Sequence, residues 1–269
     1  MSQVVGFVGA GQMGEPMVVR LVRAGFRTVV YARKEPVRER LRAAGAVVVD
    51  SAAQAAAAGD VVIACLFSDQ QLLEVLDGPE GVLATARPDA VVVSHTTGVV
   101  STVQDLAAAH PNGPILLDGP VSGSAEDIAA GELTVLLGGP AESVESVRPV
   151  LTSYADTIIA TGALGSALGV KLVNNALFAA NAQLVAVAAE VGRRLGIEDS
   201  QLLHALAAAS GNSFAADAIR RSGGFATFEQ YAAPFLRKDV AACIAATADL
   251  GVDLGQLATV IAEGPFDLT

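Results

Sequence analysis

The first 160 residues alternate short apolar runs with segments of helix-forming residues. The runs are rich in β-branched residues and nearly continuous, as in strands of a parallel sheet that is buried on both faces. This pattern predicts an α/β fold with a doubly wound parallel sheet between two layers of helices. We expect strands at residues 4–8, 28–31, 46–49, 61–66, 91–94 and 115–117, two further strands at 133–137 and 157–160, and helices at 16–23, 36–44, 51–58, 70–76 and 102–109.

After Gly162 the strand pattern ends. One long helix is expected from about residue 164 to 195, followed by shorter helices at 201–209, 214–221, 237–250 and 254–263. We therefore predict an α/β domain at 1–162 and an all-α domain at 163–269, connected by the long helix. The all-α domain has more apolar surface than about a hundred residues can bury alone. A homodimer or a larger homo-oligomer is therefore expected.

Composition and charge narrow the possible partners. Of the 269 residues, 52% are hydrophobic and 17% are charged, which excludes long disordered segments. The formal net charge is −11, from 17 basic and 28 acidic residues. We expect no nucleic-acid binding, because that requires clustered Lys and Arg side chains. A small anionic ligand would need a site built from local donors.

Several features favour a cytoplasmic location. The sequence starts on an apolar, strand-like run, so no signal peptide is expected. Cys65 and Cys243 lie far apart and match no metal-binding pattern, which suits buried free thiols in a reducing compartment. Residues 163–191 are apolar, but Lys171 and several amide side chains among them would be costly in hydrocarbon. We expect a buried helix there, no membrane span, and no bound metal.

A glycine-rich turn follows the first expected strand and opens the first helix. Its first glycine permits a tight turn, its second lets the backbone approach a pyrophosphate, and its third allows close packing of helix on strand. The helix N-terminus adds oriented N–H donors. This context predicts a dinucleotide-binding site formed by Gly9, Ala10, Gly11, Gln12, Met13 and Gly14.

The residues after the second expected strand indicate which dinucleotide binds. An NAD site usually offers Asp or Glu there for the ribose 2′-hydroxyl. This chain has Arg33 and Lys34 instead, and no acid before Glu35. Two cations can pair with a 2′-phosphate, whereas a solvated basic pair is the alternative. We expect NADP(H) to be favoured over NAD(H).

Two further clusters carry candidate chemistry. Small residues and a proline at 118–124 form a loop of N–H and hydroxyl donors that suits a carboxylate, although it could equally be a structural turn. In the long helix, Lys171 has no carboxylate nearby in the sequence. It shares one helix face with Asn174, Asn175 and Phe178. A lysine partly removed from water there could transfer protons, whereas a lysine that extends along the helix to solvent is the structural alternative.

Together these motifs resemble the β-hydroxyacid dehydrogenases, which include 3-hydroxyisobutyrate dehydrogenase, tartronate semialdehyde reductase and the glyoxylate/succinic semialdehyde reductases. The motifs occur in the family's order: the turn at 7–17, the loop at 118–124, the run at 171–175, and Lys238-Asp239. The resemblance covers essentially the whole chain. It implies a Rossmann-type N-terminal domain, an α-helical C-terminal domain and an active site between them.

The resemblance also implies roles for individual residues. Lys171 matches the family's catalytic lysine, and Asn175, with Asn174 beside it, matches the amide that places this lysine and the substrate. Ser122 and Gly123 match the loop that holds the substrate carboxylate. The remaining matches are Thr97 near the nicotinamide, Lys238 closing over cofactor and substrate, and Leu66, Phe67 and Ser68 flanking the cofactor.

Some positions depart from the family pattern. Thr96 stands where serine is usual, Phe67 and Ser68 replace a common leucine-proline pair, and Ala167 replaces a common glycine. The C-terminal helix and tail are expected to be shorter than usual. His95 lies beside Thr96, where it could approach the nicotinamide; we favour a local structural role.

We therefore expect an enzyme that transfers hydride between NADP(H) and a small β-hydroxyacid or its semialdehyde, with Lys171 as the general acid or base. Imine reductases share the fold and the N-terminal motif but generally carry another residue, such as Asp or Tyr, at the position of Lys171. A non-catalytic NADP-sensing protein is a further alternative. The retained lysine and amides count against both.

Overall fold

The computed structural model describes residues 3–249 and 251–268. The chain forms two compact units, Met1–Lys171 and Leu172–Thr269, which we call the first and the second unit. The division falls inside the long helix, whereas the border expected from the sequence, after residue 162, lies at the end of a strand.

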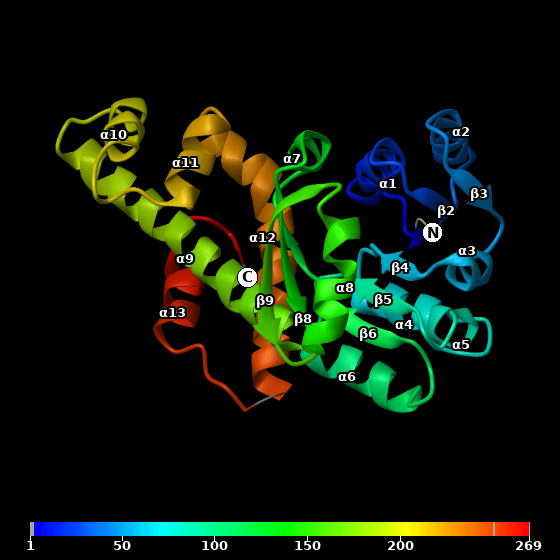
Figure 1. The fold of residues 1–269 in the computed structure, drawn as a ribbon. Coiled ribbons are helices and arrows are strands. Elements are labelled where there is room, and N and C mark those ends of the chain that lie inside the picture. The colour runs from blue at the N-terminus through cyan, green and yellow to red at the C-terminus, as the bar shows by residue number, and fades with distance from the viewer. Residues whose placement is uncertain (1–2, 250, 269) are drawn as a thin grey trace. The chain divides into compact units, whose positions relative to one another are not determined.

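The first unit contains the expected parallel sheet (Figure 1). Its first six strands lie in the order β3-β2-β1-β4-β5-β6 and are all parallel. The strand order reverses direction between β1 and β4, which in such sheets is where ligands bind. These strands are β1 (Val4–Val8), β2 (Arg27–Tyr31), β3 (Val47–Val49), β4 (Val61–Ala64), β5 (Val91–Ser94) and β6 (Ile115–Asp118).

Three more strands extend the sheet beyond β6. The two expected strands are present as β8 (Leu133–Gly138) and β9 (Ala155–Gly162). The short strand β7 (Val121–Ser122) was not expected from the sequence. Strand β8 runs antiparallel to β6 and β7, and β9 runs parallel to β8. The sheet is therefore mixed at this side, because the chain turns back on itself after β6.

The helices of the first unit agree with expectation except for three that the sequence did not reveal. These are α5 (Val82–Thr85), α7 (Ala125–Ala130) and α8 (Ala141–Leu151). Helix α5 is a single turn, α7 begins directly after the loop expected to bind an anion, and α8 contains Pro149. The others are α1 (Gly14–Arg23), α2 (Glu35–Ala43), α3 (Ala52–Ala58), α4 (Asp69–Leu76) and α6 (Val100–Ala109).

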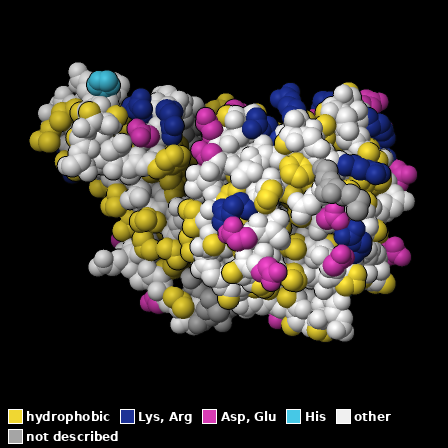
Figure 2. All heavy atoms as spheres, in the orientation of Figure 1, with side chains coloured by type: hydrophobic (Ala, Val, Ile, Leu, Met, Phe, Trp, Pro, Cys, Tyr) yellow, Lys and Arg dark blue, Asp and Glu magenta, His cyan; other side chains and the backbone are white. Residues whose placement is uncertain are grey.

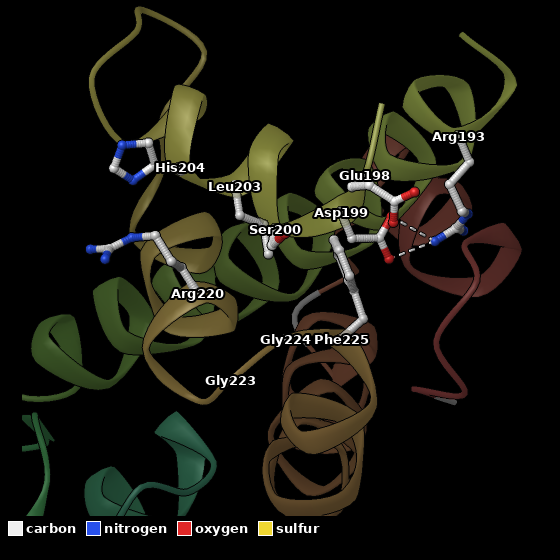
Figure 3. Close-up of a pocket in the computed structure, with 10 residues that line it drawn as sticks. All are labelled: Arg193, Glu198, Asp199, Ser200, Leu203, His204, Arg220, Gly223, Gly224 and Phe225. Carbon is white, nitrogen blue, oxygen red and sulfur yellow. Dashed lines mark hydrogen bonds and ion pairs between the residues drawn. The ribbon is translucent and has the colours of Figure 1, made fainter. Parts of the chain in front are cut away.

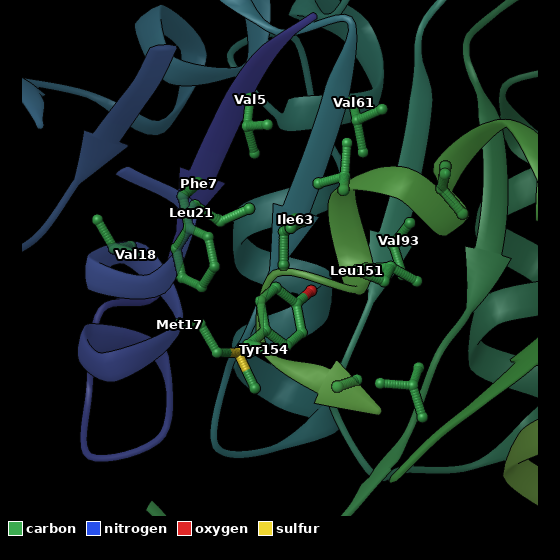
Figure 4. Close-up of a cluster of buried hydrophobic side chains, with 14 of the residues drawn as sticks. Val5, Phe7, Met17, Val18, Leu21, Val61, Ile63, Val93, Leu151 and Tyr154 are labelled. Carbon is green, nitrogen blue, oxygen red and sulfur yellow. The ribbon is translucent and has the colours of Figure 1, made fainter. Parts of the chain in front are cut away.

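Alternation along the strands fills two hydrophobic clusters, one on each face of the sheet. In β4, for example, Val61 and Ile63 face one cluster, and Val62 and Ala64 face the other. Helices α1, α2, α7 and α8 contribute to the first cluster, part of which Figure 4 shows, and α3 to α6 contribute to the second. This double coverage explains why the strands read as continuous apolar runs.

The second unit is helical throughout its described part, as expected after Gly162. Helix α9 (Ser166–Arg194) leads into it, followed by α10 (Asp199–Leu206), α11 (Phe214–Arg221), α12 (Phe225–Asp249) and α13 (Gln256–Glu263). Helix α12 starts twelve residues before the expected residue 237. The expectation was wrong because Pro234, which usually ends a helix, lies inside α12 at an exposed position. There the backbone carbonyl that it leaves unpaired can face water.

Helix α9 organises the packing of the second unit. In the part of the chain that the structure describes, it is the one helix long and apolar enough to cross a membrane by length and composition, and 56% of its most apolar stretch is buried. A core helix of a soluble protein passes the same test. The fully buried Gln183 fastens the C-terminal segment to α9: its amide donates to the carbonyls of Ile261 and Phe266, both at 2.8 Å, and accepts from the Phe266 N–H.

Candidate functional site

The glycine turn after β1 is closed by backbone contacts at its first and last positions. Gly9 has φ +97°, and a Cβ there would lie 2.2 Å from the carbonyl oxygen of Cys65. A Cβ on Gly14 would lie 2.2 Å from the carbonyl oxygen of Gly9. Around Gly11, by contrast, no atom beyond the glycine and its two chain neighbours lies within 4 Å of the Cβ position in the described residues. The turn therefore leaves open space at the one glycine over which a pyrophosphate would pass.

The helix that follows this turn has backbone donors at its start, of which the Glu15 N–H is used by the Gly11 carbonyl at 2.9 Å. Helix α1 begins at Gly14, and Met13 at its N-cap makes no side-chain hydrogen bond to the first turn. The first backbone N–H groups of a helix have no partner within the helix and attract anions. Glu15 in this turn is held by Arg40, with Nε to Oε1 at 2.6 Å and Nη2 to Oε2 at 2.8 Å. This pairing lowers the pKa of Glu15 and offsets its repulsion of an anion.

Arg33 and Lys34 follow β2 after Ala32, and β2 neighbours β1 in the sheet. Both side chains are exposed and form no ion pair with any residue that the structure describes. The arginines of the adjacent helix α2 are committed to carboxylates, for example Arg38 to Asp50 at 2.6 Å. Arg33 and Lys34 are thus the cations near this strand end that remain available to a phosphate.

Loops after β4 and β5 bring the next group of expected residues to the same end of the sheet. The Leu66 N–H donates to Thr96 Oγ1 at 3.2 Å, which joins the two loops. Phe67 is 64% exposed and Thr97 is half-buried. The Ser68 hydroxyl caps α4 by accepting from the Gln71 N–H at 3.4 Å, so it also has a structural task.

The loop after β6 contains one hydroxyl that caps a helix and two residues whose donors are accessible to a ligand. Ser124 and Asp127 form a reciprocal capping box at the start of α7, with hydrogen bonds of 3.2 and 2.6 Å. Ser122 and Gly123 are exposed. Gly123 has φ +134°, and a Cβ there would lie 2.9 Å from the side chain of Leu133. The expected carboxylate donors are therefore accessible, whereas Ser124 is occupied by the helix.

A buried carboxylate connects this strand end to the start of α9. Asp118, fully buried at the end of β6, accepts hydrogen bonds from the N–H groups of Gly165 and Leu168, both at 2.8 Å. Burial raises the pKa of Asp118, while the backbone donors act in the opposite direction. The sequence placed Asp118 in a donor loop and did not reveal this capping role, because its partners lie 47 and 50 residues away.

The expected catalytic residues occupy the first turns of α9. Lys171 is half-buried, Asn174 is exposed and Asn175 is 6% exposed. The Asn175 Nδ2 donates to Asp239 Oδ2 at 3.0 Å, and its Oδ1 accepts from Asn174 Nδ2 at 3.2 Å. Asp239 on α12 was noted in the sequence only as part of a motif with Lys238; the structure gives it a partner in the second unit.

The expected site residues thus fall into two groups. Asn174, Asn175 and Lys238 lie in the second unit, where Asn175 and Asp239 are hydrogen-bonded. The carboxyl ends of parallel strands share one edge of a sheet, so the loops after β1, β2, β4 and β5 meet there. The first unit holds Gly9, Ala10, Gly11, Gln12, Met13, Gly14, Arg33, Lys34, Leu66, Phe67, Ser68, Thr97, Ser122, Gly123 and Lys171.

A cavity of about 670 Å³ in the second unit contains none of these residues (Figure 3). It is lined by α10, by the start of α12, and by Arg193 near the end of α9. Arg193 lies 18 residues after Asn175, about 27 Å along the helix. Within the described residues, no group of three or more His, Cys, Asp or Glu side chains could hold a metal ion.

Comparison with known protein families gives matches along nearly the whole chain. The family model described as the NAD binding domain of 6-phosphogluconate dehydrogenase matches residues 4–162. The model described as NAD-binding of NADP-dependent 3-hydroxyisobutyrate dehydrogenase matches residues 165–263. The two matches meet within three residues of Gly162, where the strand pattern of the sequence ends.

Individual relatives extend this similarity. A 2-(hydroxymethyl)glutarate dehydrogenase of Eubacterium barkeri is 30% identical over 97% of this chain and 88% of its own length. An NAD-dependent L-serine dehydrogenase of Pseudomonas aeruginosa is 33% identical over 78% of this chain and 71% of its own. A solved Mycobacterium tuberculosis 3-hydroxyisobutyrate dehydrogenase with L-serine has a TM-score of 0.87 at 27% identity, covering 97% of this chain and 92% of that one.

Two glycine substitutions separate the structure of the turn from its binding role. Gly9→Ala should lower the free energy of unfolding by about 2–4 kcal/mol, because its Cβ meets a backbone carbonyl and its φ is positive. Gly11→Ala should leave the melting temperature unchanged but weaken nicotinamide dinucleotide binding about tenfold or more, because its methyl group would enter the open space. Thermal unfolding and cofactor titration measure both effects. Unchanged cofactor affinity in a folded Gly11→Ala variant would contradict a pyrophosphate over this turn.

Proposed function

Because the chain belongs to the β-hydroxyacid dehydrogenase family, a family of NAD(P)-dependent oxidoreductases, we propose that it transfers hydride reversibly between the cofactor and a small β-hydroxyacid or its semialdehyde. The observation that supports this most directly is the pair of half-buried Lys171 and buried Asn175 on successive turns of α9, with Asn175 hydrogen-bonded to Asp239. A lysine beside a fixed amide is suited to proton transfer at a bound hydroxyl or carbonyl.

In this proposal the glycine turn and the start of α1 bind the dinucleotide. The backbone donors at Gln12 to Gly14 would hold the pyrophosphate above Gly11, and Leu66, Phe67, Ser68 and Thr97 would flank the cofactor near the nicotinamide. When bound, the nicotinamide supplies or accepts the hydride at its C4. The exposed Phe67 can cover the ring and keep water from it.

Substrate orientation is assigned to the loop after β6 and to α12. The Ser122 hydroxyl and the backbone at Gly123 anchor the substrate carboxylate, which fixes the carbon that faces the cofactor. Lys238 adds a positive charge that suits an anionic substrate or the cofactor phosphates. A small anionic substrate is consistent with donors that lie on accessible loops of an otherwise acidic protein.

Proton transfer is assigned to Lys171. In the direction of reduction, its Nζ gives a proton to the alkoxide oxygen that develops as hydride reaches the carbonyl carbon, and in the reverse direction it accepts that proton. Asp239 holds the Asn175 amide in one orientation, with Nδ2 turned toward the carboxylate. The Asn175 oxygen accepts from Asn174, so both ends of the amide are fixed on the helix that carries Lys171.

We propose NADP(H) as the preferred cofactor. Arg33 and Lys34 stand where an NAD site usually presents an acid, and neither forms an ion pair within the described residues. A 2′-phosphate placed there would receive charge-assisted hydrogen bonds, and Arg33 could bind it with two parallel N–H groups. Glu35, the acid next to Lys34, is paired with Arg38 and Arg42 of α2, which reduces its repulsion of the phosphate.

The proposed assembly is a homodimer or larger homo-oligomer built on the region 163–269. One face of α9 from Val173 onward, together with Leu195 directly after the helix, exposes a stripe of large aliphatic side chains, each 42–73% exposed. Figure 2 shows hydrophobic side chains gathered over this part of the molecule. We call this surface the α9 stripe; it consists of Val173, Leu177, Leu184, Val187, Val191 and Leu195.

The α9 stripe suits a second copy of the same chain. It is about 33 Å long and about 10 Å wide, a patch of several hundred Å², which is larger than scattered surface apolar residues produce. It carries no charge, so it complements itself when two copies pair about a twofold axis. Burial of α9 against a second copy of the chain would also account for its apolar composition, so no membrane is needed to explain it. The free thiols of Cys65 and Cys243 agree with the cytoplasmic location that we propose.

A substrate screen tests the proposed activity. Small β-hydroxyacids, semialdehydes and cyclic imines are each assayed with NADP(H) and NAD(H) by following nicotinamide absorbance. We expect turnover of at least one hydroxyacid–semialdehyde pair. Turnover of cyclic imines alone would support an imine reductase instead, and cofactor binding without any turnover would support a sensing protein.

Lys171→Ala should lower kcat about 100-fold or more, because a general acid acts mainly in the transition state. Lys171→Arg should not restore the rate, since the guanidinium keeps its proton near neutral pH. Arg194→Ala, which removes a cation at the other end of α9, is the matched control. Steady-state kinetics and cofactor titration measure the effects. A Lys171→Ala variant within a few-fold of the parent kcat would rule out this mechanism.

Arg33→Ala should weaken NADPH binding about 10- to 100-fold, the range for a lost charge-assisted hydrogen bond, and leave NADH binding nearly unchanged. Arg42→Ala on α2 serves as the control, because Arg42 is paired with Glu35. Isothermal titration with both cofactors gives the four affinities. Equal losses for NADPH and NADH in Arg33→Ala would show that this side chain does not bind a 2′-phosphate.

Leu184→Glu should shift the protein from dimer or larger oligomer to monomer at micromolar concentration, because it places a charge in the middle of the α9 stripe. Gln201→Glu adds the same charge at an exposed position of α10 and should not change the mass. Light scattering without detergent measures the mass of each variant. A monomeric parent protein would refute the proposed assembly.

A further inference from the structure

A histidine and a tyrosine meet in the buried part of the first unit, close to the carboxyl ends of its strands. His95 directly follows β5 and is 4% exposed; Tyr154, between α8 and β9, is fully buried. Their rings lie edge to face, with centroids 5.8 Å apart. Figure 4 shows the Tyr154 ring packed among apolar side chains with its hydroxyl group turned away from Met17. The His95 and Tyr154 side chains thus bring two polar groups into a buried region that is otherwise lined by apolar residues.

The contacts of His95 fix the position of its proton. Nδ1 lies 2.5 Å from the carbonyl oxygen of Gly119, which can only accept, so Nδ1 carries the hydrogen. Nε2 lies 2.8 Å from the Tyr154 hydroxyl. Burial lowers the pKa of His95 to about 4 and raises the pKa of Tyr154 well above its usual range. The ring is therefore neutral near pH 7, and Nε2 accepts from the tyrosine.

Nearby titratable groups do not disturb this arrangement. The Cys65 thiol interacts electrostatically with Tyr154, and burial raises the pKa of that thiol to about 12, so it stays neutral. The Asp118 carboxylate, next to Gly119 in the chain, is turned to the N–H groups at the start of α9. The Tyr154 hydroxyl, the imidazole and the Gly119 carbonyl thus form one chain of hydrogen bonds with a single direction.

This chain ends on the residue that begins the donor loop. The Gly119 N–H donates to the Ser94 carbonyl at 2.7 Å, so His95 holds the other side of the same residue. A Cβ on Gly119 would lie 3.2 Å from His95 Nδ1 and 2.7 Å from Val93, so the close approach requires glycine. Three residues further on, Ser122 pairs with Thr134 of β8.

We propose that His95 is a positioning residue for residues 119–123: its Nδ1–H holds the Gly119 carbonyl, so that Ser122 and Gly123 present their donors to the substrate carboxylate in one fixed geometry. The proposal rests on the carboxylate-binding role assigned above to these two residues. Tyr154 acts through His95 by keeping the proton on Nδ1. Without the bond from His95, the start of the loop is held by the Gly119 N–H and by the Pro120 carbonyl, which accepts from Leu136 at 3.0 Å.

Two variants of nearly equal shape isolate this hydrogen bond. His95→Leu removes the donor, whereas His95→Asn has the same branched outline and keeps an N–H close to the position of Nδ1. Both lose the contact with Tyr154, so a purely structural role would affect them alike. The probes are 3-hydroxyisobutyrate and L-serine, assayed with saturating cofactor, and the parent protein provides the reference.

We expect KM for the hydroxyacid to rise about tenfold in His95→Leu and to stay within threefold of the parent in His95→Asn. In both variants kcat and cofactor affinity should change by less than threefold, because the loop binds substrate and not the dinucleotide. Equal KM values for the two variants, with equally lowered melting temperatures, would overturn the proposal and leave His95 as a packing residue.

Hydrogen exchange keeps the test independent of the proposed activity. The backbone amides of Gly119 and of residues 121–123 should exchange about tenfold faster in His95→Leu than in His95→Asn, whether or not either probe is turned over; Pro120 has no amide hydrogen. A parent protein without turnover would thus defeat the proposed function alone, and equal exchange would defeat the positioning role alone. If His95→Leu does not fold, Tyr154→Phe replaces it: its KM should rise two- to fivefold, and an unchanged KM would overturn the proposal.

Discussion

The buried carboxylate of Asp118 is the interaction on which the arrangement of the candidate site depends. It joins the end of β6 to the first turn of α9, where two N–H groups donate to it at 2.8 Å. A negative charge at a helix N-terminus is favourable, which offsets part of the desolvation that raises its pKa. Lys171 lies one turn further along α9. The carboxylate that caps this helix fixes where the helix starts, and it thereby fixes the position of the lysine.

The same residue shows how closely the site is packed into the fold. A Cβ on Gly138 would lie 2.2 Å from Asp118 Oδ1, so the neighbouring strand must carry a glycine there. Gly119, the next residue in the chain, is held by Ser94 on one side and by His95 on the other. Two adjacent residues at the end of β6 therefore serve two different elements: one caps α9 and the other begins the donor loop.

Local signals explain what the sequence could predict. Strands β1 and β5 and helix α11 have the expected bounds, because their apolar patterns are uninterrupted. The glycine turn was recognisable because its steric reasons lie within six consecutive residues. Where α12 contains Pro234, the local signal indicated a boundary that packing overrides. The bonds of Asn175 to Asp239 and of His95 to Tyr154 join residues 64 and 59 positions apart, which no local pattern encodes.

Electrostatics shows why net charge is a poor guide to the ligand of this protein. A formal charge of −11 would repel an anionic cofactor or substrate at long range. Yet salt screens exposed charges beyond about 8 Å at physiological ionic strength. What an anion meets at contact is decided by nearby groups: the uncapped start of α1, Glu15 already paired with Arg40, and two exposed cations after β2. Glu35 is paired with arginines of α2, whereas Arg33 and Lys34 form no ion pair within the described residues, so an acidic protein could offer local positive charge to a phosphate without a basic surface.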